Sequence, residues 1–357
     1  MTKYKVGIIG CGRIAGYLED DPLRFHPCTH VGAYKSLPNC DVVACCSRNE
    51  ENVKLFAHKF SIKKYYTDYR KMLDNEPLDI ISVATYAPSH CDIVVEAAQR
   101  NLKGIFCEKA MATSLEEADK MIQACERNGV ILSVNHTRRW QSDFIKAKEM
   151  IKQGAIGELQ TIYGNFSGNI LHTGVHMFDI IIYFAGDPQM VWGLLKEGHE
   201  EFSVSSGYKF QWDNELMQNI EDKDGFVTIL FKSGVVAQLF GIGKRYFVFE
   251  LDIQGTEGRI RIGNGIFEYY KMAKSPRNSD YFELKKCPVS IPSAPSALVS
   301  AVEDLISGIE GKKETKSSGR EARKSLEVAL SVYESDRCGS CPVRFPFTNT
   351  SLKVISR

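Results

Sequence analysis

The segment Gly10-Cys11-Gly12-Arg13-Ile14-Ala15-Gly16 decides the fold of this chain of 357 residues. It follows the apolar run Tyr4–Ile9, which predicts a buried strand, and it carries the first two glycines of a G-x-G-x-x-G pattern. In that pattern the glycines allow a tight turn and close approach to a pyrophosphate, and a small residue, here Ala15, lets helix and strand pack closely. A helix opening in the motif would then hold the pyrophosphate at its N-terminus. The predicted dinucleotide contacts are Gly10, Gly12, Arg13 and Ile14.

The rest of the first 135 residues supports this interpretation, because short apolar runs alternate there with helical stretches. Near-continuous apolar runs are typical of strands that helices cover on both faces. The predicted strands are Tyr4–Ile9, Asp41–Cys46, a short one near Tyr65–Tyr66, Asp79–Ala84, Gly104–Cys107 and Val130–Val134. One helix between them begins at a capping box, Ser114-Leu-Glu-Glu117, and ends at Asn128-Gly129. We therefore predict an α/β domain over residues 1–135 with a doubly wound parallel sheet.

After Asn135 the pattern changes. An amphipathic stretch, Ser142–Gln153, and an almost wholly apolar one, Val175–Ala185, predict helices, and alternating strands joined by tight turns follow from Val191 to Met272. Such alternation predicts a large, mainly antiparallel open sheet with one buried face. Two closing helices are expected, at about Pro295–Gly308 and Gly319–Arg337. Residues 136–357 are thus predicted to form a second α/β domain, for substrate binding and oligomerisation.

Composition argues against several functional classes. The chain has 45 Lys+Arg against 44 Asp+Glu, a formal net charge of +1, so it lacks the positive field that draws proteins to nucleic acids or acidic membranes. No apolar run reaches the ~20 residues that span a bilayer, and the start of the chain resembles a strand more than a secretory signal. Eleven cysteines without a regular framework favour free thiols and a cytoplasmic location.

The end of the second predicted strand bears on the choice of dinucleotide. An NAD-preferring site usually places an acidic residue there to bond the ribose hydroxyl, whereas this strand ends in Ser47-Arg48. A hydroxyl and a guanidinium suit a 2′-phosphate, because arginine grips phosphate with several donors. We expect an NAD(P) cofactor, with a preference for NADP.

Two groups of cysteine and histidine residues invite a metal interpretation, and we predict no metal at either. The stretch Asp20–Thr29 resembles an insertion after a short first helix, and His26, Cys28 and His30 lie in or next to it. No further pair of ligands follows at a zinc-site spacing, so a polar loop near the active-site mouth is expected. The pair Cys338 and Cys341 is a lone CxxC and is expected to remain as plain thiols.

Further motifs of this chain resemble those of the Gfo/Idh/MocA family, named after glucose–fructose oxidoreductase and inositol dehydrogenase. Glu108-Lys-Ala-Met-Ala112 is similar to the family's E-K-P-x-A signature, and Thr85-Tyr-Ala-Pro-Ser-His90 to its T-P-x-x-x-H loop. Asn135-His-Thr-Arg-Arg139 resembles its domain-crossing segment, and 168–179 resembles G-G-x-x-x-D-x-G-x-H-x-x-D. The matches run in order over nearly the whole chain. The resemblance implies a Rossmann domain followed by an α/β domain with a large open antiparallel sheet.

The resemblance also implies roles for individual residues. It gives Lys109 and His176 catalytic roles and places Lys109 beside the cofactor as well. His172 is a third catalytic candidate. Three departures stand out, because Ala110 and Tyr86 replace family prolines and His172 replaces the family's aspartate. The implied cofactor contacts are Thr85, His90, Glu108 and Lys109, and the implied substrate contacts are Lys109, Arg139, His172, His176 and Asp179.

These residue types suit the oxidation of a ring hydroxyl of a sugar, sugar derivative or cyclitol, or reduction of the ketone. A general base takes the hydroxyl proton while a cation stabilises the developing oxyanion, roles that His176 and Lys109 can fill. His176 is expected in the first turn of its helix, where the positive helix end disfavours imidazolium. Three alternatives remain open: an oxidoreductase that never releases its cofactor, a redox-neutral NAD-dependent glycosidase and a non-catalytic dinucleotide sensor.

The second domain is also expected to carry an oligomer interface. Phe247, Phe249, Leu251 and Ile253 alternate so that all four point to one side of a strand. An open sheet of this kind commonly pairs with a second copy, so we expect a homodimer or homotetramer. The pocket walls are expected to come from this sheet and from loops such as Ser203–Gln218.

Overall fold

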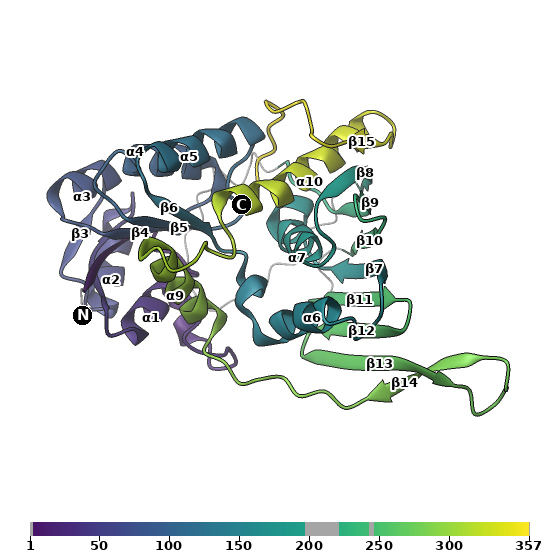
Figure 1. The fold of residues 1–357 in the computed structure, drawn as a ribbon. Coiled ribbons are helices and arrows are strands. Elements are labelled where there is room, and N and C mark those ends of the chain that lie inside the picture. The colour runs from purple at the N-terminus through teal and green to yellow at the C-terminus, as the bar shows by residue number, and fades with distance from the viewer. Residues whose placement is uncertain (1–2, 197–220, 243–245, 357) are drawn as a thin grey trace. The chain divides into compact units, whose positions relative to one another are not determined.

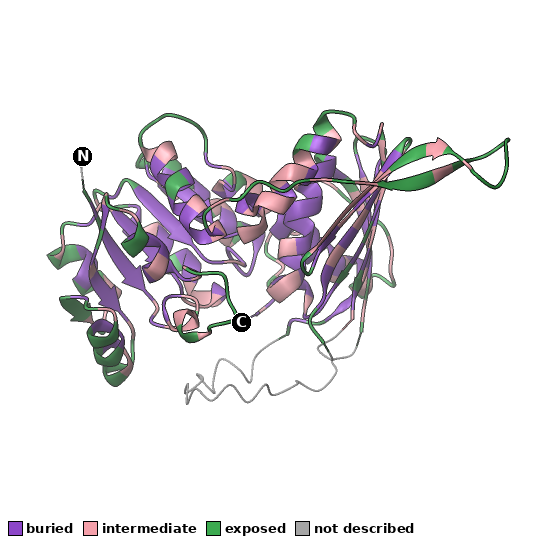
Figure 2. Ribbon diagram, turned by 90° about the horizontal axis from the view of Figure 1, so that it is seen from below, coloured by how far each residue is buried: buried purple, intermediate pink, exposed green. Residues whose placement is uncertain are grey.

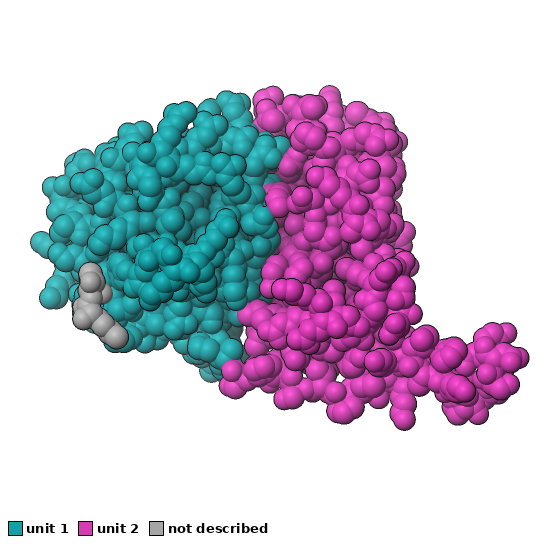
Figure 3. Space-filling view, viewed as in Figure 1, with its two compact units in different colours: residues 1–140, 294–323 teal, residues 141–293, 324–357 magenta. Residues whose placement is uncertain are grey.

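The computed structural model describes residues 3–196, 221–242 and 246–356. Two compact units emerge, residues 1–140 with 294–323 (unit 1) and residues 141–293 with 324–357 (unit 2; Figure 3). The predicted division at residue 135 lies close to the first change of unit, but residues 294–323 return to unit 1. Their helix packs an apolar face there, a contact that sequence order alone does not reveal. Among the described residues, no helix combines the length and apolar character needed to cross a membrane.

Unit 1 contains a sheet of six parallel strands in the order β3-β2-β1-β4-β5-β6. The order reverses between β1 and β4, the place where open α/β sheets bind ligands. The inner strands are almost completely buried, whereas the edge strand β3 is partly exposed. The predicted doubly wound sheet is confirmed. Its strands are β1 (Tyr4–Ile9), β2 (Cys40–Cys46), β3 (Lys64–Tyr66), β4 (Ile80–Val83), β5 (Gly104–Cys107) and β6 (Ile131–Val134).

Helices cover both faces of this sheet, with α4 and α5 on one face and α1, α2 and α9 on the other (Figure 1). The predicted capping box is confirmed, because the Glu117 N–H donates to the Ser114 hydroxyl at 3.2 Å and Asn128 ends α5. The helical segments are η1 (Tyr17–Asp20), α1 (His30–Ser36), α2 (Glu50–Lys59), α3 (Tyr69–Asn75), η2 (Ala87–Ser89), α4 (His90–Ala97), α5 (Leu115–Arg127), η3 (Thr137–Trp140) and α9 (Ala297–Ile309).

The first crossover helix is built from two pieces of chain. The glycine motif leads into a single turn and then η1, which agrees with the expected short first helix followed by an insertion. The backbone N–H groups of His30 and Val31 donate to the carbonyls of Ile14 and Ala15 at 3.1 and 2.9 Å. His30 therefore takes the place that the fourth residue after Ile14 has in an uninterrupted helix. The intervening residues form an insertion that loops out of the helix.

Unit 2 contains a nine-stranded sheet in the order β14-β13-β12-β11-β7-β10-β9-β8-β15. Its neighbours are antiparallel except for β7 and β10. Asn264 and Gly265 have positive φ in the turn between β12 and β13, as the sequence Asn-Gly predicts for a tight hairpin. The strands are β7 (Leu159–Phe166), β8 (Pro188–Leu195), β9 (Gly225–Phe231), β10 (Val236–Gly241), β11 (Phe249–Gly255), β12 (Gly258–Gly263), β13 (Ile266–Lys274), β14 (Phe282–Cys287) and β15 (Val343–Arg344).

One face of this sheet is buried under helices, and alternate residues of each inner strand point into that core (Figure 2). The helical segments are α6 (Ser142–Lys152), η4 (Ile170–Gly174), α7 (Val175–Ala185) and α10 (Gly319–Arg337), which crosses the division between units. Phe249, Leu251 and Ile253 lie on one side of β11, as expected, and all three are buried in this core, so they do not form an exposed interface. Only Phe247, which precedes β11, is exposed.

Candidate functional site

Four predicted site segments of unit 1 follow neighbouring strands. Gly10 follows β1, Ser47 follows β2, Thr85 lies just beyond β4 and Glu108 follows β5. Since β2, β1, β4 and β5 are adjacent and parallel, these segments gather at the carboxyl edge of the sheet. That edge, beside the point where strand order reverses, is where such sheets bind dinucleotides.

Gly10 makes the turn that the motif requires. Its φ is +96°, in the region that favours glycine, and an added Cβ would lie 2.5 Å from the Ala84 carbonyl oxygen. The Gly10 N–H donates to the Cys46 carbonyl at 2.9 Å, which fastens the turn between β2 and β4. Ala15 is completely buried against the core, as the motif predicts. Arg13 on the same turn is exposed and Ile14 is half-buried.

At the tip of β2 a hydroxyl and a guanidinium follow the strand. The Ser47 N–H donates to the Tyr66 carbonyl at 3.1 Å, its side chain is half-buried, and Arg48 is exposed. Asn49 then caps α2 by accepting from the Asn52 N–H. No acidic side chain occupies the two positions directly after the strand.

The loop after β4 places Thr85 and His90 in different environments. Thr85 is half-buried, and its hydroxyl accepts from Ser89 at 2.8 Å. The His90 ring is fully buried, with its two nitrogens 3.0 Å from the carbonyl oxygens of Ala110 and Thr85. Burial lowers the pKa of His90, and the contacts of its ring join the loop after β4 to the loop after β5.

Glu108 stands at the centre of a buried polar network. One carboxylate oxygen lies 2.9 Å from His30 Nε2 and accepts from the Asn135 amide at 2.6 Å. His30 Nδ1 lies 2.9 Å from the Ser82 hydroxyl. Burial by itself would raise the pKa of Glu108, but the hydrogen bond and charge of His30 outweigh it and hold that pKa below its ordinary value. Glu108 is therefore an ionised, anchored group and not a mobile one.

Lys109 follows this anchor directly. Its backbone N–H lies 3.3 Å from the second Glu108 oxygen, and its side chain is half-buried. The Lys109–Ala110 peptide bond is cis. Ala110 stands where the family has a proline. On the N-terminal side of Lys109, the buried Glu108 side chain fixes the segment.

Arg139 has a structural environment in unit 1. Its guanidinium is buried, donates to the Lys316 carbonyl at 2.6 Å and lies 3.3 Å from a Glu321 oxygen. These contacts join η3 to the segment that leads into α10. Arg139 thus forms a partly buried ion pair with Glu321, and its contact with substrate stays a prediction.

The remaining predicted residues belong to unit 2 and lie on one continuous helical segment. His172 is in η4 and half-buried, His176 is half-buried in α7, and Asp179 is buried. The segment begins at Ile170, since η4 runs directly into α7. His176 is the second residue of α7 and so lies in its first turn, as expected, but η4 extends the helical segment back to Ile170.

Asp222 occupies the true start of that helical segment. Its carboxylate accepts from the backbone N–H groups of Leu171 and His172 at 2.9 and 2.8 Å. It also accepts from the hydroxyls of Tyr333 and Ser356 at 2.7 and 2.8 Å. Burial raises the pKa of Asp222, and these four hydrogen bonds oppose the rise without cancelling it. Sequence reasoning missed this residue, because its capping role joins segments far apart in the chain.

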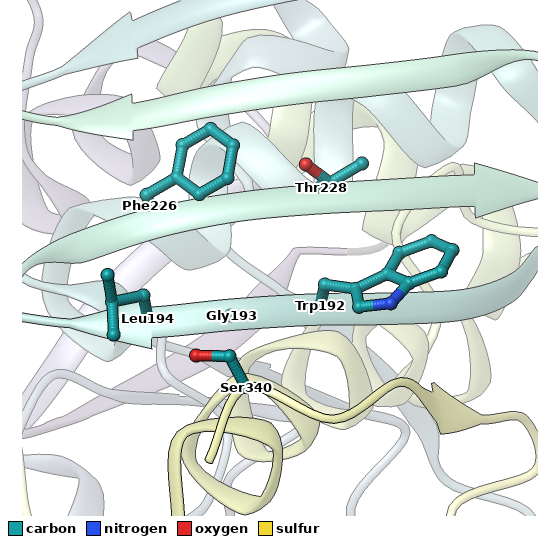
Figure 4. A pocket seen from close by; sticks show the side chains of 6 residues that line it. All are labelled: Trp192, Gly193, Leu194, Phe226, Thr228 and Ser340. Carbon is teal, nitrogen blue, oxygen red and sulfur yellow. The ribbon is translucent and has the colours of Figure 1, made fainter.

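A cavity of about 460 Å³ lies elsewhere in unit 2, on the exposed side of β8 and β9 (Figure 4). Trp192 and Leu194 on β8 and Phe226 and Thr228 on β9 line it together with Gly193 and Ser340. None of the predicted site residues contributes to it. The predicted pocket wall 203–218 lies outside the described residues.

Comparison with protein families gives two matches that together span most of the chain. Residues 4–136 match the Gfo/Idh/MocA oxidoreductase family, NAD-binding Rossmann fold. Residues 164–345 match the C-terminal alpha/beta domain of the same oxidoreductase family.

Several curated relatives are named as dehydrogenases. D-apiose dehydrogenase of Rhizobium rhizogenes is 24% identical over 94% of this chain and 96% of its own length. D-apiose dehydrogenase of Paraburkholderia graminis is 31% identical over 52% of this chain and 51% of its own. Myo-inositol 2-dehydrogenase of Thermotoga maritima is 24% identical over 73% and 75%.

Solved structures share the fold over the full length. Levoglucosan dehydrogenase in complex with NADH and L-sorbose has a TM-score of 0.78 at 18% identity, covering 98% of this chain and 100% of that one. The WlbA dehydrogenase of Bordetella pertussis, in complex with NADH and UDP-GlcNAcA, has a TM-score of 0.74 at 19% identity, covering 97% and 100%. At these identities the likeness establishes the fold.

Proposed function

The chain belongs to the Gfo/Idh/MocA oxidoreductase family, and on that premise we propose that it transfers a hydride between NAD(P) and a ring hydroxyl or ketone of a sugar, sugar derivative or cyclitol. The observation that carries the proposal is the carboxyl edge of the unit 1 sheet. There the Gly10 turn lies two strands away from Lys109, because β4 alone separates β1 from β5. The names of the relatives, which act on apiose and inositol, support this substrate class.

The residues at that edge fit a dinucleotide. A Cβ at Gly10 would collide with the backbone, so the turn keeps a close crossing that only glycine allows. Gly12 and Arg13 would hold the pyrophosphate, and Ser47 with Arg48 would hold a 2′-phosphate. When bound, the nicotinamide ring supplies the hydride acceptor or donor. We propose NADP as the preferred form, because the donors Ser47 and Arg48, and no carboxylate, occupy the two positions directly after β2.

Lys109 and His176 would perform the proton and charge chemistry. In the oxidation direction the substrate hydroxyl loses its proton to His176 while its carbon loses a hydride, and the Lys109 ammonium stabilises the oxyanion that develops. Glu108 keeps the Lys109 segment fixed, which reduces the rearrangement needed during the reaction. His172, in place of the family's aspartate, and Asp179 are assigned to the substrate side.

A turnover screen of sugars, sugar phosphates, nucleotide sugars and cyclitols with NAD and with NADP tests the proposal. With an accepted substrate, Lys109→Ala should lower kcat/KM by about 10²–10⁴-fold while cofactor binding is kept. Lys103→Ala is the matched control, since Lys103 precedes the other end of β5 and pairs with Asp79 at 2.7 Å. Hydrolysis without net NADH formation would instead identify a glycosidase, and full turnover by Lys109→Ala would refute the assigned role.

The cofactor preference has its own test. Arg48→Ala should weaken NADP binding by about 10–100-fold, because a charged hydrogen bond contributes ~1.5–3 kcal/mol. NAD binding should change little. Fluorescence titration with both cofactors measures this, and an equal loss for NAD and NADP would contradict the preference.

We further propose that the protein is a homodimer or homotetramer in the cytoplasm, as its free thiols suit a reducing compartment. The exposed side of strands β7, β8 and β10 is the interface that we propose. Tyr163, Leu194 and Phe240 on these strands are 40–54% exposed, and exposed apolar patches mark interaction sites. Light scattering should report a smaller species for Leu194→Lys. The matched control is Leu55→Lys, which changes a 59% exposed leucine of unit 1. An unchanged mass for both variants would place the interface elsewhere.

A further inference from the structure

The insertion in the first crossover helix folds around the side chain of Glu19. One carboxylate oxygen accepts from the backbone N–H groups of Cys28 and Thr29 at 2.8 and 2.9 Å and from the Thr29 hydroxyl at 2.7 Å. Burial would raise the pKa of Glu19, but these bonds and His26 hold it below its ordinary value. Glu19 is therefore ionised, and its other oxygen faces His26.

The His26 ring is held so that one nitrogen points at that carboxylate. Nε2 lies 2.8 Å from the Asp21 carbonyl oxygen, which can only accept, so Nε2 carries a hydrogen. Nδ1 lies 2.8 Å from Glu19 Oε2. A neutral ring would then turn a lone pair toward a carboxylate, so a cation, either a proton or a metal ion, belongs between the two atoms.

The thiol of Cys28 completes the arrangement, with Sγ 3.8 Å from His26 Nδ1. The ligand atoms of Glu19, His26 and Cys28 all lie within 4.8 Å of one another, and this is the one such cluster among the described residues. Tetrahedral zinc would separate sulfur from nitrogen by about 3.6 Å and nitrogen from oxygen by about 3.4 Å. The separations of 3.8 and 2.8 Å differ from these values by about 0.2 and about 0.6 Å, shifts that side-chain rotations in an exposed loop can supply.

We propose that Glu19 Oε2, His26 Nδ1 and Cys28 Sγ bind a divalent transition-metal cation such as Zn²⁺. One sulfur, one nitrogen and one oxygen favour such an ion over Mg²⁺ or Ca²⁺, which prefer oxygen ligands throughout. The bond from Nε2 to a backbone carbonyl is the outer contact that metal-binding histidines usually make. On binding, the thiol proton and the proton between Glu19 and His26 pass to solvent.

The surroundings permit such a site and suggest its role. The His26 side chain is 36% exposed, so water can reach a fourth position on the ion. Arg24 in the same loop pairs with Asp21 at 3.2 Å. A metal would fasten the two ends of the insertion directly after the glycine turn. This inference does not depend on the proposed function.

The sequence-based prediction of no metal considered His26, Cys28 and His30, whereas the folded loop groups His26 and Cys28 with Glu19. His30 follows Cys28 closely in the chain, but it is completely buried and its ring is engaged by Ser82 and Glu108. Glu19 replaces it as the third ligand. Only the folded loop brings Glu19 beside His26, because η1 and the following turn reverse the chain between them.

Cobalt(II) titration of the whole chain, first stripped with a chelator, tests the site. We expect one equivalent to produce the near-ultraviolet thiolate-to-cobalt band and the visible bands of tetrahedral cobalt, and Zn²⁺ to displace them. Cys28→Ser should remove the thiolate band, and His26→Ala and Glu19→Gln should weaken Zn²⁺ binding by about 10–100-fold or more in calorimetry. Zn²⁺ should also raise the melting temperature of the parent but not of Glu19→Gln.

The CxxC pair provides the matched control, since Cys338 and Cys341 are the other neighbouring thiols that reach solvent. The double variant Cys338→Ser/Cys341→Ser and the variant His58→Ala, on the surface of α2, should keep the full cobalt spectrum. A band that survives Cys28→Ser but disappears in the double variant would overturn the proposal. A parent protein without any band would show that a proton alone joins Glu19 to His26.

Discussion

Each unit has one buried carboxylate that adjoins predicted catalytic residues, and the environments of these two carboxylates differ. Glu108 in unit 1 precedes Lys109 and is paired with His30. Asp222 in unit 2 caps the helix that carries His172 and His176, and its four partners are all uncharged donors. The pKa of Glu108 is lowered despite burial, whereas burial raises the pKa of Asp222.

The number of hydrogen bonds alone does not decide the direction in which the pKa of a buried acid shifts. A partner that can carry a positive charge offsets the loss of hydration, and four neutral donors offset it incompletely. Unit 1 thus fixes the segment of Lys109 through a buried carboxylate–histidine hydrogen bond, and unit 2 fixes its helix through neutral donors. Substitutions in the two networks should therefore behave differently.

Glu108→Ala should produce the largest effect. Removing the carboxylate leaves His30 and Asn135 buried without their acceptor, and breaking a buried pair in this way costs about 3–5 kcal/mol. Urea unfolding measures the loss. Glu116→Ala removes the exposed acid of an i,i+4 pair with Lys120 on α5 and should cost less than ~0.5 kcal/mol. Equal losses for the two variants would contradict the role of the network.

Asp222→Asn should destabilise the protein by a smaller amount, about 1–3 kcal/mol. The amide keeps one acceptor oxygen but turns an NH₂ group toward donors, so at least one of them loses its partner. Unfolding by urea again gives the value. The control is Asp187→Asn, an acid 49% exposed in its pair with Lys324, for which a loss comparable to that of Asp222→Asn would argue against special stabilisation by the cap.

The pH dependence should have opposite signs in the two units. Stability from Glu108 is present above the unfolded value of 4.5 and is lost as pH falls, so the deficit of Glu108→Gln should shrink in acid. The pKa of Asp222 is raised in the folded state, so its ionisation above pH 3.8 lowers the stability of the parent protein. Asp222→Asn does not ionise, so the stability difference between parent and variant should shrink toward neutral pH. Each unit of pKa shift corresponds to about 1.4 kcal/mol. Melting curves from neutral pH to below pH 4.5 test this, and deficits that change in parallel would refute the difference.

The smallest effect is expected for Ser356→Ala, which removes one of the four donors to Asp222. A single neutral hydrogen bond contributes about 0.5–1.5 kcal/mol, and the other three donors remain. The control is Ser351→Ala, whose exposed hydroxyl donates only to Asn349 at 3.3 Å. Thermal unfolding should separate the two variants, and a loss confined to the control would mean that Ser356 does not support the cap.

The sequence predicts the elements of both units well where local pattern and tertiary packing agree. The six parallel strands, the capping box at Ser114 and the Asn264-Gly265 turn all appear in the structure. Each depends on short-range properties, such as apolar runs, a side chain that caps its own helix, or a residue that accepts positive φ. Family motifs then locate Lys109 and His176 with no knowledge of their surroundings.

The sequence fails where a residue's role depends on partners far along the chain. The His30 ring is hydrogen-bonded to Ser82 and Glu108, and the Asp222 carboxylate caps the helical segment that contains His172. Neither pairing has a spacing that a pattern could reveal. The sequence indicated the insertion after the short first helix, but not that His30 and Val31 continue that helix beyond it.

The order of apolar and polar residues along the chain was enough to predict the two sheets and the glycine turn, since these follow from periodicity and backbone preference, and the resemblance of the motifs indicated the family. Tertiary structure alone decided which acid is paired with a histidine, which is surrounded by neutral donors, and which three side chains converge on the insertion. The physical reason is that desolvation, charge pairing and metal coordination act over a few ångströms of space, and residues that near to one another can be far apart in the chain.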